Sequence, residues 1–486
     1  MLKERAPRTD SEWASIGEEQ FRDSIATVDT RGKRVWIFPK KPSGTFHRWR
    51  IAVTVVLLTL LFIGPFLKLN GQPFLLLNFF ERRFIIFGQA FWPQDFFLLA
   101  ILLITFFVFI ILFTVVFGRV WCGWMCPQTL FMEMVFRKIE YWIEGDAPAQ
   151  RRLEKGPWTV ARISKKAAKQ ILFAIVSVLI SFTFMSYLTG VESSIDLVGH
   201  PAEHAGGFIA LVAFTGIFHF NFARFREQAC IAVCPYGRLQ GVLLSKASIV
   251  IAYDWIRGEP RKHLKRHPEV ASNAGHCIDC KLCVHVCPTG IDIRNGTQME
   301  CVNCTACIDV CDEVMVKIGK PTGLIRYASH NSIRDGVSRI FSVRVMGYSV
   351  VLGILLSILG FALITRSDIE TTVLKVPGTL YQRENSFITN LYNVEFVNKT
   401  FDEMQLEIKI ESPPTAQIIK ADRRPIVVPA SGLIKGVYFI RMPEENVTSP
   451  GTTVTIGVYG HGRKIEDVSV RFIGPVSSTP DAGGEN

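Results

Sequence analysis

CIDCKLCVHVCP at positions 277–288 and CVNCTACIDVCD at positions 301–312 are the two stretches that decide the fold at the centre of this chain. Each has the spacing Cys-x2-Cys-x2-Cys-x3-Cys, and together they hold eight of the twelve cysteines. This spacing is typical of two [4Fe–4S] clusters in which the fourth cysteine of each run binds the other cluster. The sequence therefore predicts one cluster on Cys277, Cys280, Cys283 and Cys311, and a second on Cys301, Cys304, Cys307 and Cys287.

A structural zinc site and a disulfide framework are the alternatives for these cysteines. Zinc sites usually show separated Cys-x2-Cys pairs rather than a triple followed by x3-Cys. A disulfide framework would need an oxidising compartment. The doubled motif therefore favours a bacterial-type two-cluster ferredoxin module, which we expect at 256–335 and which would transfer single electrons.

The rest of the chain is too apolar for an ordinary soluble protein. Of its 486 residues 49% are hydrophobic, and 36 are Phe. About twenty consecutive apolar residues suffice to cross a bilayer. We therefore predict a multi-domain integral membrane protein with a five-helix transmembrane bundle: residues 1–50 precede it, and a region at 51–255 carries four of the spans. The expected spans are 51–69, 96–117, 168–188, 207–225 and 343–365.

The placement of Lys and Arg predicts the orientation of these spans. Residues 31–50 and the connection after the second span are rich in Lys and Arg, whereas 190–206 contain neither. Basic loops stay on the cytoplasmic side, so we expect the N-terminus and the ferredoxin module in the cytoplasm. The net charge of +11 is then explained by topology and contact with lipid headgroups. It does not indicate nucleic-acid binding, because the charges are spread over every cytoplasmic loop.

Residues 368–475 change to alternating apolar and polar residues, the pattern of half-buried strands. Four such runs lie at 393–397, 404–410, 436–440 and 452–459. The segment is about the size of an immunoglobulin-like sandwich, so we predict an all-β domain outside the cytoplasm that docks a partner. Residues 476–486 are rich in Ser, Gly and Pro, and we expect them to be disordered.

The other four cysteines form a second repeat. The second span leads into Cys122-Gly-Trp-Met-Cys126-Pro127, and the fourth into Cys230-Ile-Ala-Val-Cys234-Pro235. If each pair lay on one helix, its thiols would share a face. Such pairs could bind Cu(I), or all four could meet as a four-sulfur site or a third iron–sulfur cluster. The alternative is that they are buried reduced thiols without chemistry.

The histidines exclude a membrane haem. Only His219 lies well within a span, where a bis-His haem would need pairs, and we expect it to be a hydrogen-bonded core residue. His200 and His204 are expected in a solvated loop, and His276 and His285 border cluster cysteines. No CxxCH, GxGxxG or P-loop motif is present. The chain therefore cannot take up hydride itself, and must receive electrons from a donor protein or a quinol.

Taken together, these features resemble the cytochrome oxidase accessory proteins of the FixG/CcoG (RdxA) type over nearly the whole chain. The resemblance implies a bacterial inner-membrane protein that assists assembly of cbb3-type cytochrome c oxidase. It also implies a cupric reductase, which would reduce Cu(II) to Cu(I) for the oxidase copper site. The implied partners are the oxidase or its assembly and copper-delivery factors, an unknown cytosolic electron donor and membrane lipid.

Two other classes of function fit the same sequence. One is a quinol-linked respiratory polyferredoxin subunit, which would be indicated by reduction of the clusters by quinol. The other is an assembly scaffold whose clusters only sense redox state. Copper reduction by the purified protein would separate the cupric reductase from the scaffold.

Overall fold

The computed structural model describes Thr27 and residues 33–69, 71–79, 83–86, 88–92, 95–261, 275–336, 341–378, 380–421, 424–447 and 451–475. The tail at 476–486, where we predict disorder, and nearly all of the segment before residue 33 lie outside this part of the chain. The chain divides into two compact units. Unit 1 consists of residues 1–65, 101–186 and 190–357, and unit 2 of residues 66–100, 187–189 and 358–486.

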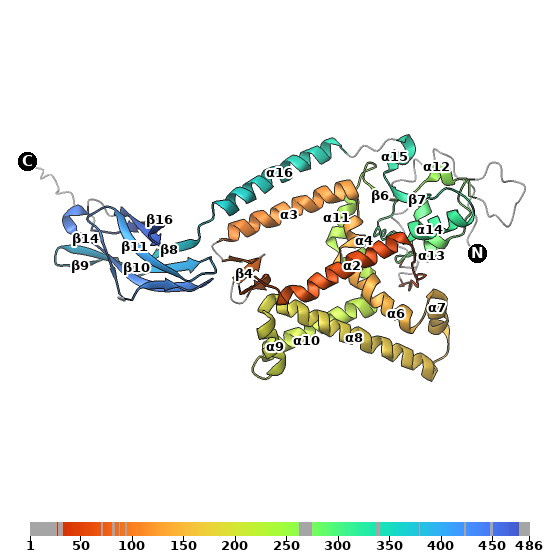
Figure 1. The fold of residues 1–486 in the computed structure, drawn as a ribbon, viewed down its shortest axis with the longest axis horizontal. Helices are drawn as coiled ribbons and strands as arrows, with labels where there is room; N and C mark the ends of the chain where they lie inside the picture. The colour runs from red at the N-terminus through yellow and green to blue at the C-terminus, as the bar shows by residue number, and fades with distance from the viewer. Residues whose placement is uncertain are drawn as a thin grey trace, which may run out of the picture. The chain divides into compact units, whose positions relative to one another are not determined.

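In the described part of the chain, five helices are long and apolar enough to cross a membrane, as predicted (Figure 1). Three of them begin before the expected position, at Thr45, Val160 and Ala205. The first two continue N-terminally through basic residues, which apolar run length alone excluded from the predicted spans. The five helices are α2 (Thr45–Ile63), α3 (Phe96–Phe117), α8 (Val160–Thr189), α10 (Ala205–Phe220) and α16 (Val343–Ile364).

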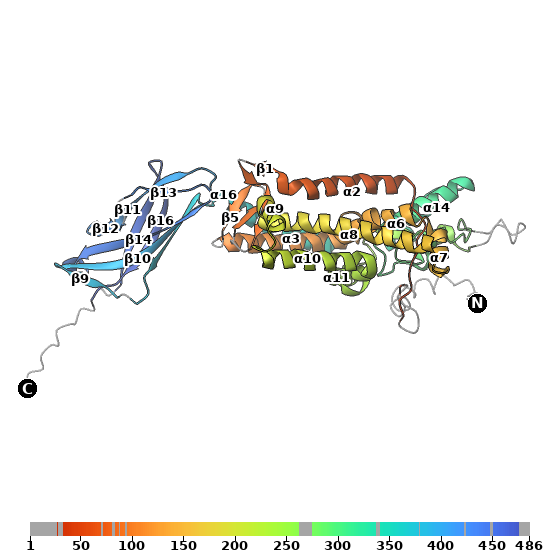
Figure 2. The ribbon, with the colours of Figure 1, turned by 90° about the horizontal axis from the view of Figure 1, so that it is seen from below.

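Aromatic packing holds α8 beside α10 in unit 1, and both views of the ribbon show the two helices side by side (Figures 1 and 2). The rings of Phe184 and Phe214 stack with their centroids 5.0 Å apart. Phe136 stacks on Phe222 at 4.6 Å, which joins the segment after the first Cys-x3-Cys motif to the end of α10. Shorter helices complete this part of the unit: α7 (Ala147–Lys155), α9 (Val191–Gly199) and η4 (Asn221–Phe225).

Each Cys-x3-Cys-Pro motif lies at a break between two helices. Pro127 and Pro235 are the first residues of the helices that follow, and Cys126 and Cys234 before them are extended. A proline disfavours the helical conformation of the preceding residue, so the two thiols of a pair do not lie on one helix and do not share a helical face. The first motif joins α4 (Val120–Trp124) to α5 (Pro127–Leu130), η3 (Phe131–Phe136) and α6 (Arg137–Ile143), and the second joins η5 (Ala229–Val233) to α11 (Pro235–Leu243).

The two cysteine runs lie in a small α+β module of unit 1. Strand β6 (Val250–Tyr253) pairs antiparallel with β7 (Ile325–Ala328), and both runs lie between these strands in sequence. The pairing adds Val250–Tyr253 to the module, which we expected to begin at residue 256. Buried Ile251, Ile308 and Met315 form part of its core. The remaining elements are α12 (Trp255–Gly258), α13 (Leu282–His285), η7 (Ile293–Asn295), α14 (Ala306–Lys317) and α15 (His330–Asp335).

The C-terminal part of unit 2 is the predicted β-sandwich, and all four predicted strand runs lie within strands of the structure. One sheet has the order β12-β14-β10-β8, with β9 also paired to β10, and the other has the order β13-β11-β15-β16. Inward-facing Tyr392, Phe396 and Phe472 are buried between the sheets. The strands are β8 (Ile369–Lys375), β9 (Gln382–Glu384), β10 (Phe387–Asn398), β11 (Met404–Ser412), β12 (Gln417–Lys420), β13 (Ile426–Val428), β14 (Leu433–Pro443), β15 (Thr452–Gly460) and β16 (Arg463–Phe472).

A buried carboxylate ties the remaining segment of unit 2 to the sandwich. Asp95 is 2% exposed and accepts hydrogen bonds from Arg366 Nη2 and Lys399 Nζ, both at 2.6 Å. Lys399 also pairs with Glu370 of β8 at 2.7 Å. Residues 66–100 are therefore anchored to the sandwich by charge as well as by packing. Their elements are β1 (Lys68–Leu69), β2 (Gln72–Pro73), β3 (Leu75–Asn78), β4 (Arg83–Ile86) and β5 (Gln89–Phe91).

Candidate functional site

The structure gathers the eight cysteines of the ferredoxin module around two cavities. One cavity is lined by the first predicted ligand set and the other by the second, with Cys283 lining both. Thiols from both runs thus line each cavity, and the rest of the lining is largely apolar. This all-thiol donor set suits iron–sulfur clusters. The two sets are Cys277, Cys280, Cys283 and Cys311, and Cys287, Cys301, Cys304 and Cys307.

The backbone has the same unusual conformation in both runs. Asp279 and Lys281 flank the second cysteine of the first run, and Asn303 and Thr305 flank that of the second, all four with φ between 51° and 64°. This left-handed region is disfavoured for residues with a side chain, above all for the β-branched Thr305. Strain of this kind persists only where the surrounding structure enforces it. Here these four residues turn the backbone of each cysteine run sharply beside the two cavities.

Most of the ferredoxin thiols are shielded from water. Burial raises the pKa of Cys304 to about 11 and the pKa values of Cys283, Cys301 and Cys311 to about 12. When free, these four thiols are therefore protonated at neutral pH, and binding of iron must release their protons. Cys280 differs from the other cysteines of the module in being exposed.

The cysteines of the two Cys-x3-Cys motifs lie within electrostatic range of one another. All are half-buried. Burial raises the pKa of Cys230 to about 12, and charge on Cys126, Cys122 and Cys234 would add to this shift. Burial also raises the pKa of Cys122 to about 11, and the Gln240 amide donates a hydrogen bond to its sulfur at 3.3 Å. The sulfur atoms of the two motifs, which are soft metal ligands, therefore interact with one another electrostatically.

The first motif is in direct contact with the second cysteine run. A Cβ added to Gly123 would lie 2.4 Å from the carbonyl oxygen of Asn303 and 2.6 Å from that of Val302, so only glycine permits this approach. Cys122 packs with Val302 and Cys304 in one apolar cluster. The Cys301–Cys304 segment thus lies against the helix that carries Cys122.

Two buried arginines bridge the same junction. Arg50 is 5% exposed and donates hydrogen bonds to the carbonyls of Gly123 and Cys304, each at 3.0 Å. Arg119 is 6% exposed and donates to the carbonyls of Gly237, at 2.7 Å, and Met299. From the sequence, both arginines were assigned only to the basic segments that predict the cytoplasmic side of the membrane. Their positions at the ends of apolar spans were the one available sign of a buried role.

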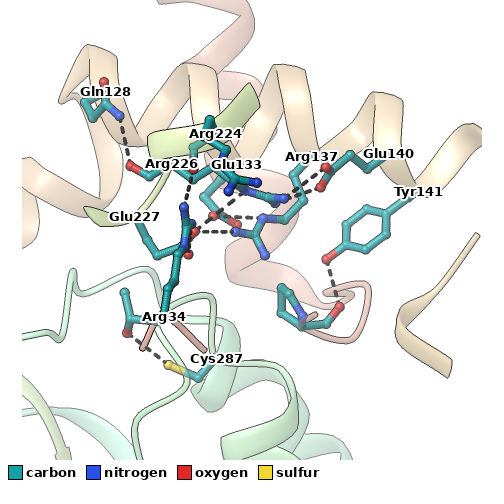
Figure 3. Close-up of polar contacts among 12 residues, drawn as sticks. Arg34, Gln128, Glu133, Arg137, Glu140, Tyr141, Arg224, Arg226, Glu227 and Cys287 are labelled. Carbon is teal, nitrogen blue, oxygen red and sulfur yellow. Dashed lines mark hydrogen bonds and ion pairs between the residues drawn. The ribbon is translucent and has the colours of Figure 1, made fainter. Parts of the chain in front are cut away.

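A buried ionic network lies beside the Cys-x3-Cys motifs and was not predicted from the sequence (Figure 3). Arg226 donates to both carboxylate oxygens of Glu140, at 3.0 and 2.8 Å. Arg137 is 1% exposed and lies 3.1 Å from Glu133 and 3.8 Å from Glu227. The spacing of Glu133, Arg137 and Glu140, three and four residues apart on one helical segment, could have indicated such a network.

No histidine in the described part of the chain lines either cavity of the ferredoxin module. His200 and His204 are exposed, as expected, and each is hydrogen-bonded to Asp196, at 2.9 and 2.8 Å. His219 is half-buried, but its Nδ1 has no hydrogen-bond partner in the described part of the chain. The expectation that it is a hydrogen-bonded core residue therefore fails for this nitrogen. The backbone carbonyl of His285 accepts a hydrogen bond from Lys40 N at 2.8 Å.

Known protein families account for each of these regions. A family described as "4Fe-4S dicluster domain" matches residues 225–330, which include the second Cys-x3-Cys motif and both cysteine runs. A family described as "4Fe-4S binding domain" matches residues 99–146, around the first motif. The "IG-like fold at C-terminal of FixG" matches residues 359–475, the sandwich.

Three relatives extend over most of the chain. Protein RdxB of Cereibacter sphaeroides is 36% identical, covering 79% of this chain and 84% of the relative. Nitrogen fixation protein FixG of Rhizobium meliloti is 33% identical, covering 79% and 80%. Protein RdxA of Cereibacter sphaeroides is 32% identical, covering 92% and 97%. The chain therefore belongs to the FixG/RdxA family of membrane-bound iron–sulfur electron-transfer proteins.

Proposed function

We propose that this protein passes single electrons to Cu(II) at the thiols of the two Cys-x3-Cys motifs, and that the Cu(I) formed serves the assembly of cbb3-type cytochrome c oxidase. The observation that carries the proposal is the contact at Gly123. It places Cys122 against the Cys301–Cys304 segment, so soft copper ligands adjoin an electron-transfer module.

The residues present suit a one-electron reaction. When bound to the eight ferredoxin cysteines, iron–sulfur clusters supply reversible storage of single electrons. A donor protein would lose one electron for each Cu(II) that gains one. Thiolates favour the softer Cu(I), so Cys122, Cys126, Cys230 and Cys234 would bind the product state in preference to the substrate.

Sidedness and partners belong to the same proposal. The basic loops support a cytoplasmic ferredoxin module, where a cytosolic donor has access, and a periplasmic sandwich. Copper would be released to the oxidase or to its copper-delivery and assembly factors. Asp95, Lys399 and Arg366 anchor the sandwich to residues 66–100, which suits a domain that presents a fixed surface to a partner.

A third [4Fe–4S] cluster on the four Cys-x3-Cys thiols is the second candidate for this site. It is favoured by the match of an iron–sulfur family to residues 99–146, which contain Cys122 and Cys126 but none of the eight ferredoxin cysteines. Iron analysis of the anaerobically purified protein separates the two. About eight iron atoms per chain would leave the four thiols for copper, and about twelve would assign them to a cluster.

The test of copper reduction uses the full-length protein in detergent. The protein is reduced with dithionite, freed of reductant and mixed anaerobically with Cu(II) and a chromogenic Cu(I) chelator. We expect Cu(I) to form in proportion to the electrons stored. The absorbance that the clusters lost on reduction should return in parallel. Cluster reoxidation by quinone but not by Cu(II) would instead support the respiratory subunit. Reoxidation by neither would support the redox-sensing scaffold.

A further inference from the structure

Arg50 and Arg119 make equivalent bridges from the two thiol units to the second cysteine run. Arg50 joins the first motif, through Gly123, to the carbonyl of Cys304. Arg119 joins the helix after the second motif, through Gly237, to the carbonyl of Met299. Each of the two Cys-x3-Cys units is therefore held to the Met299–Cys304 segment by one buried guanidinium group.

Neither guanidinium has a carboxylate partner among the residues that the structure describes. Both donate only to backbone carbonyls there, and Nε of Arg119 is buried with no hydrogen-bond partner. The neighbouring buried arginines differ, because Arg137 lies against Glu133 and Arg226 against Glu140. A buried cation without a counter-charge is strongly unfavourable. Something anionic must therefore balance Arg50 and Arg119.

Cysteine sulfurs are among the groups in reach of the two arginines that can carry negative charge, and Glu133 also acts electrostatically on Cys304. Arg50 acts electrostatically on Cys304, and Arg119 on Cys301 and Cys122. All three sulfurs become negatively charged when they are ligands, because the thiolate rather than the thiol binds metal. The buried positive charges are thus placed where ligand binding creates negative charge.

We propose that Arg50 and Arg119 are positioning residues that supply the counter-charge of the thiolate ligands at this junction and thereby favour the reduced state of the group held by Cys301, Cys304, Cys307 and Cys287. Reduction adds one electron and hence one negative charge, with no bond broken and no proton required. A fixed positive charge in a poorly solvated setting stabilises the more negative state. This inference rests on the electron-transfer function and does not depend on copper.

The test compares Arg50→Gln and Arg119→Gln in the full-length, anaerobically purified protein. Arg48→Gln is the matched control, because Arg48 lies on the same helix two residues away and is exposed. Midpoint potentials are measured by redox titration with electron paramagnetic resonance, together with iron content. We expect each Gln variant to retain its iron and to show at least a tenfold smaller equilibrium constant for reduction of one cluster. For a one-electron couple this is a shift of about 59 mV to more negative potential.

Arg50→Lys separates charge from geometry. It keeps the positive charge but cannot reproduce the forked hydrogen bonding, so we expect a potential nearer to wild type than that of Arg50→Gln. If Arg50→Gln loses iron, Arg119→Gln is titrated in its place. A potential of Arg50→Gln, or of Arg119→Gln in its place, equal to that of Arg48→Gln would overturn the inference. A shift that occurs in a protein unable to reduce Cu(II) would uphold it and refute the copper proposal alone.

Discussion

At the scale of single residues, Gly123 sets the distance between the two thiol systems. An alanine Cβ there would approach two backbone carbonyls at 2.4 and 2.6 Å, and backbone cannot give way as a flexible side chain can. We expect Gly123→Ala to cost about 1–3 kcal/mol of stability and to slow reoxidation of the reduced protein by Cu(II). Stopped-flow absorbance of the clusters measures that rate. Gly216→Ala is the control, since a Cβ there meets nothing within 4 Å, and equal rates in both variants would contradict the prediction.

The thiols of the Cys-x3-Cys motifs give a second prediction at this scale. Replacing Cys126 and Cys234 with Ser removes one sulfur from each pair with little change in volume. We expect unchanged iron, weaker Cu(I) binding by at least tenfold and slower Cu(II) reduction, because a hydroxyl is a poor ligand for a soft ion. Competition with a Cu(I) chelator measures the affinity. Unchanged copper affinity and reduction would make these thiols structural, and a loss of about four iron atoms would assign them to a third cluster.

At the scale of elements, each of the two cysteine runs contributes cysteines to both cavities. Cys283 lies among the ligands of the first cavity and Cys304 among those of the second. We expect Cys283→Ser and Cys304→Ser each to lower the iron content from about eight to about four atoms per chain, with loss of different paramagnetic signals. Zinc in place of iron in the wild-type protein would refute the electron-transfer chemistry altogether.

The buried ionic network holds α6, α8 and the turn after η4 together. Glu140 pairs with Arg226 at 2.8 Å and with Lys169 at 3.6 Å. Glu140→Gln leaves buried positive charge uncompensated, so we expect a loss of about 3–5 kcal/mol, measured by thermal unfolding in detergent. The control Glu154→Gln breaks a more exposed pair with Lys166 and should cost less than about 1 kcal/mol. Similar losses for both variants would argue against the network as a stabilising element.

At the scale of the whole molecule, the distribution of basic residues predicts the topology independently of the chemistry. A reporter active only outside the cytoplasm should work when fused after Gly460, in the sandwich. It should fail when fused after Thr297, between the two cysteine runs. The opposite result would place the clusters in the oxidising compartment, where the proposed cytosolic donor has no access.

The sequence by itself determined the features that depend on local patterns. Cysteine spacing predicts one ligand set that contains Cys277 and Cys311 and another that contains Cys287 and Cys301, and the residues of each set line one of the two cavities. Apolar run length predicted five helices, and alternation predicted the strands of the sandwich. These succeed because ligand spacing, span length and strand periodicity are properties of consecutive residues.

Only the tertiary structure decided how the thiol systems meet and which charges are buried. Arg50 is 73 residues from Gly123 and 254 residues from Cys304 in sequence, yet it hydrogen-bonds both. From the sequence Arg50, Arg119 and Arg137 were grouped with the other basic residues of the predicted cytoplasmic loops, because span ends and helical spacing are weak signs of burial. Whether such a residue faces lipid headgroups or a buried junction depends on where distant segments pack. That packing also fixes the approach at Gly123, which no local pattern encodes.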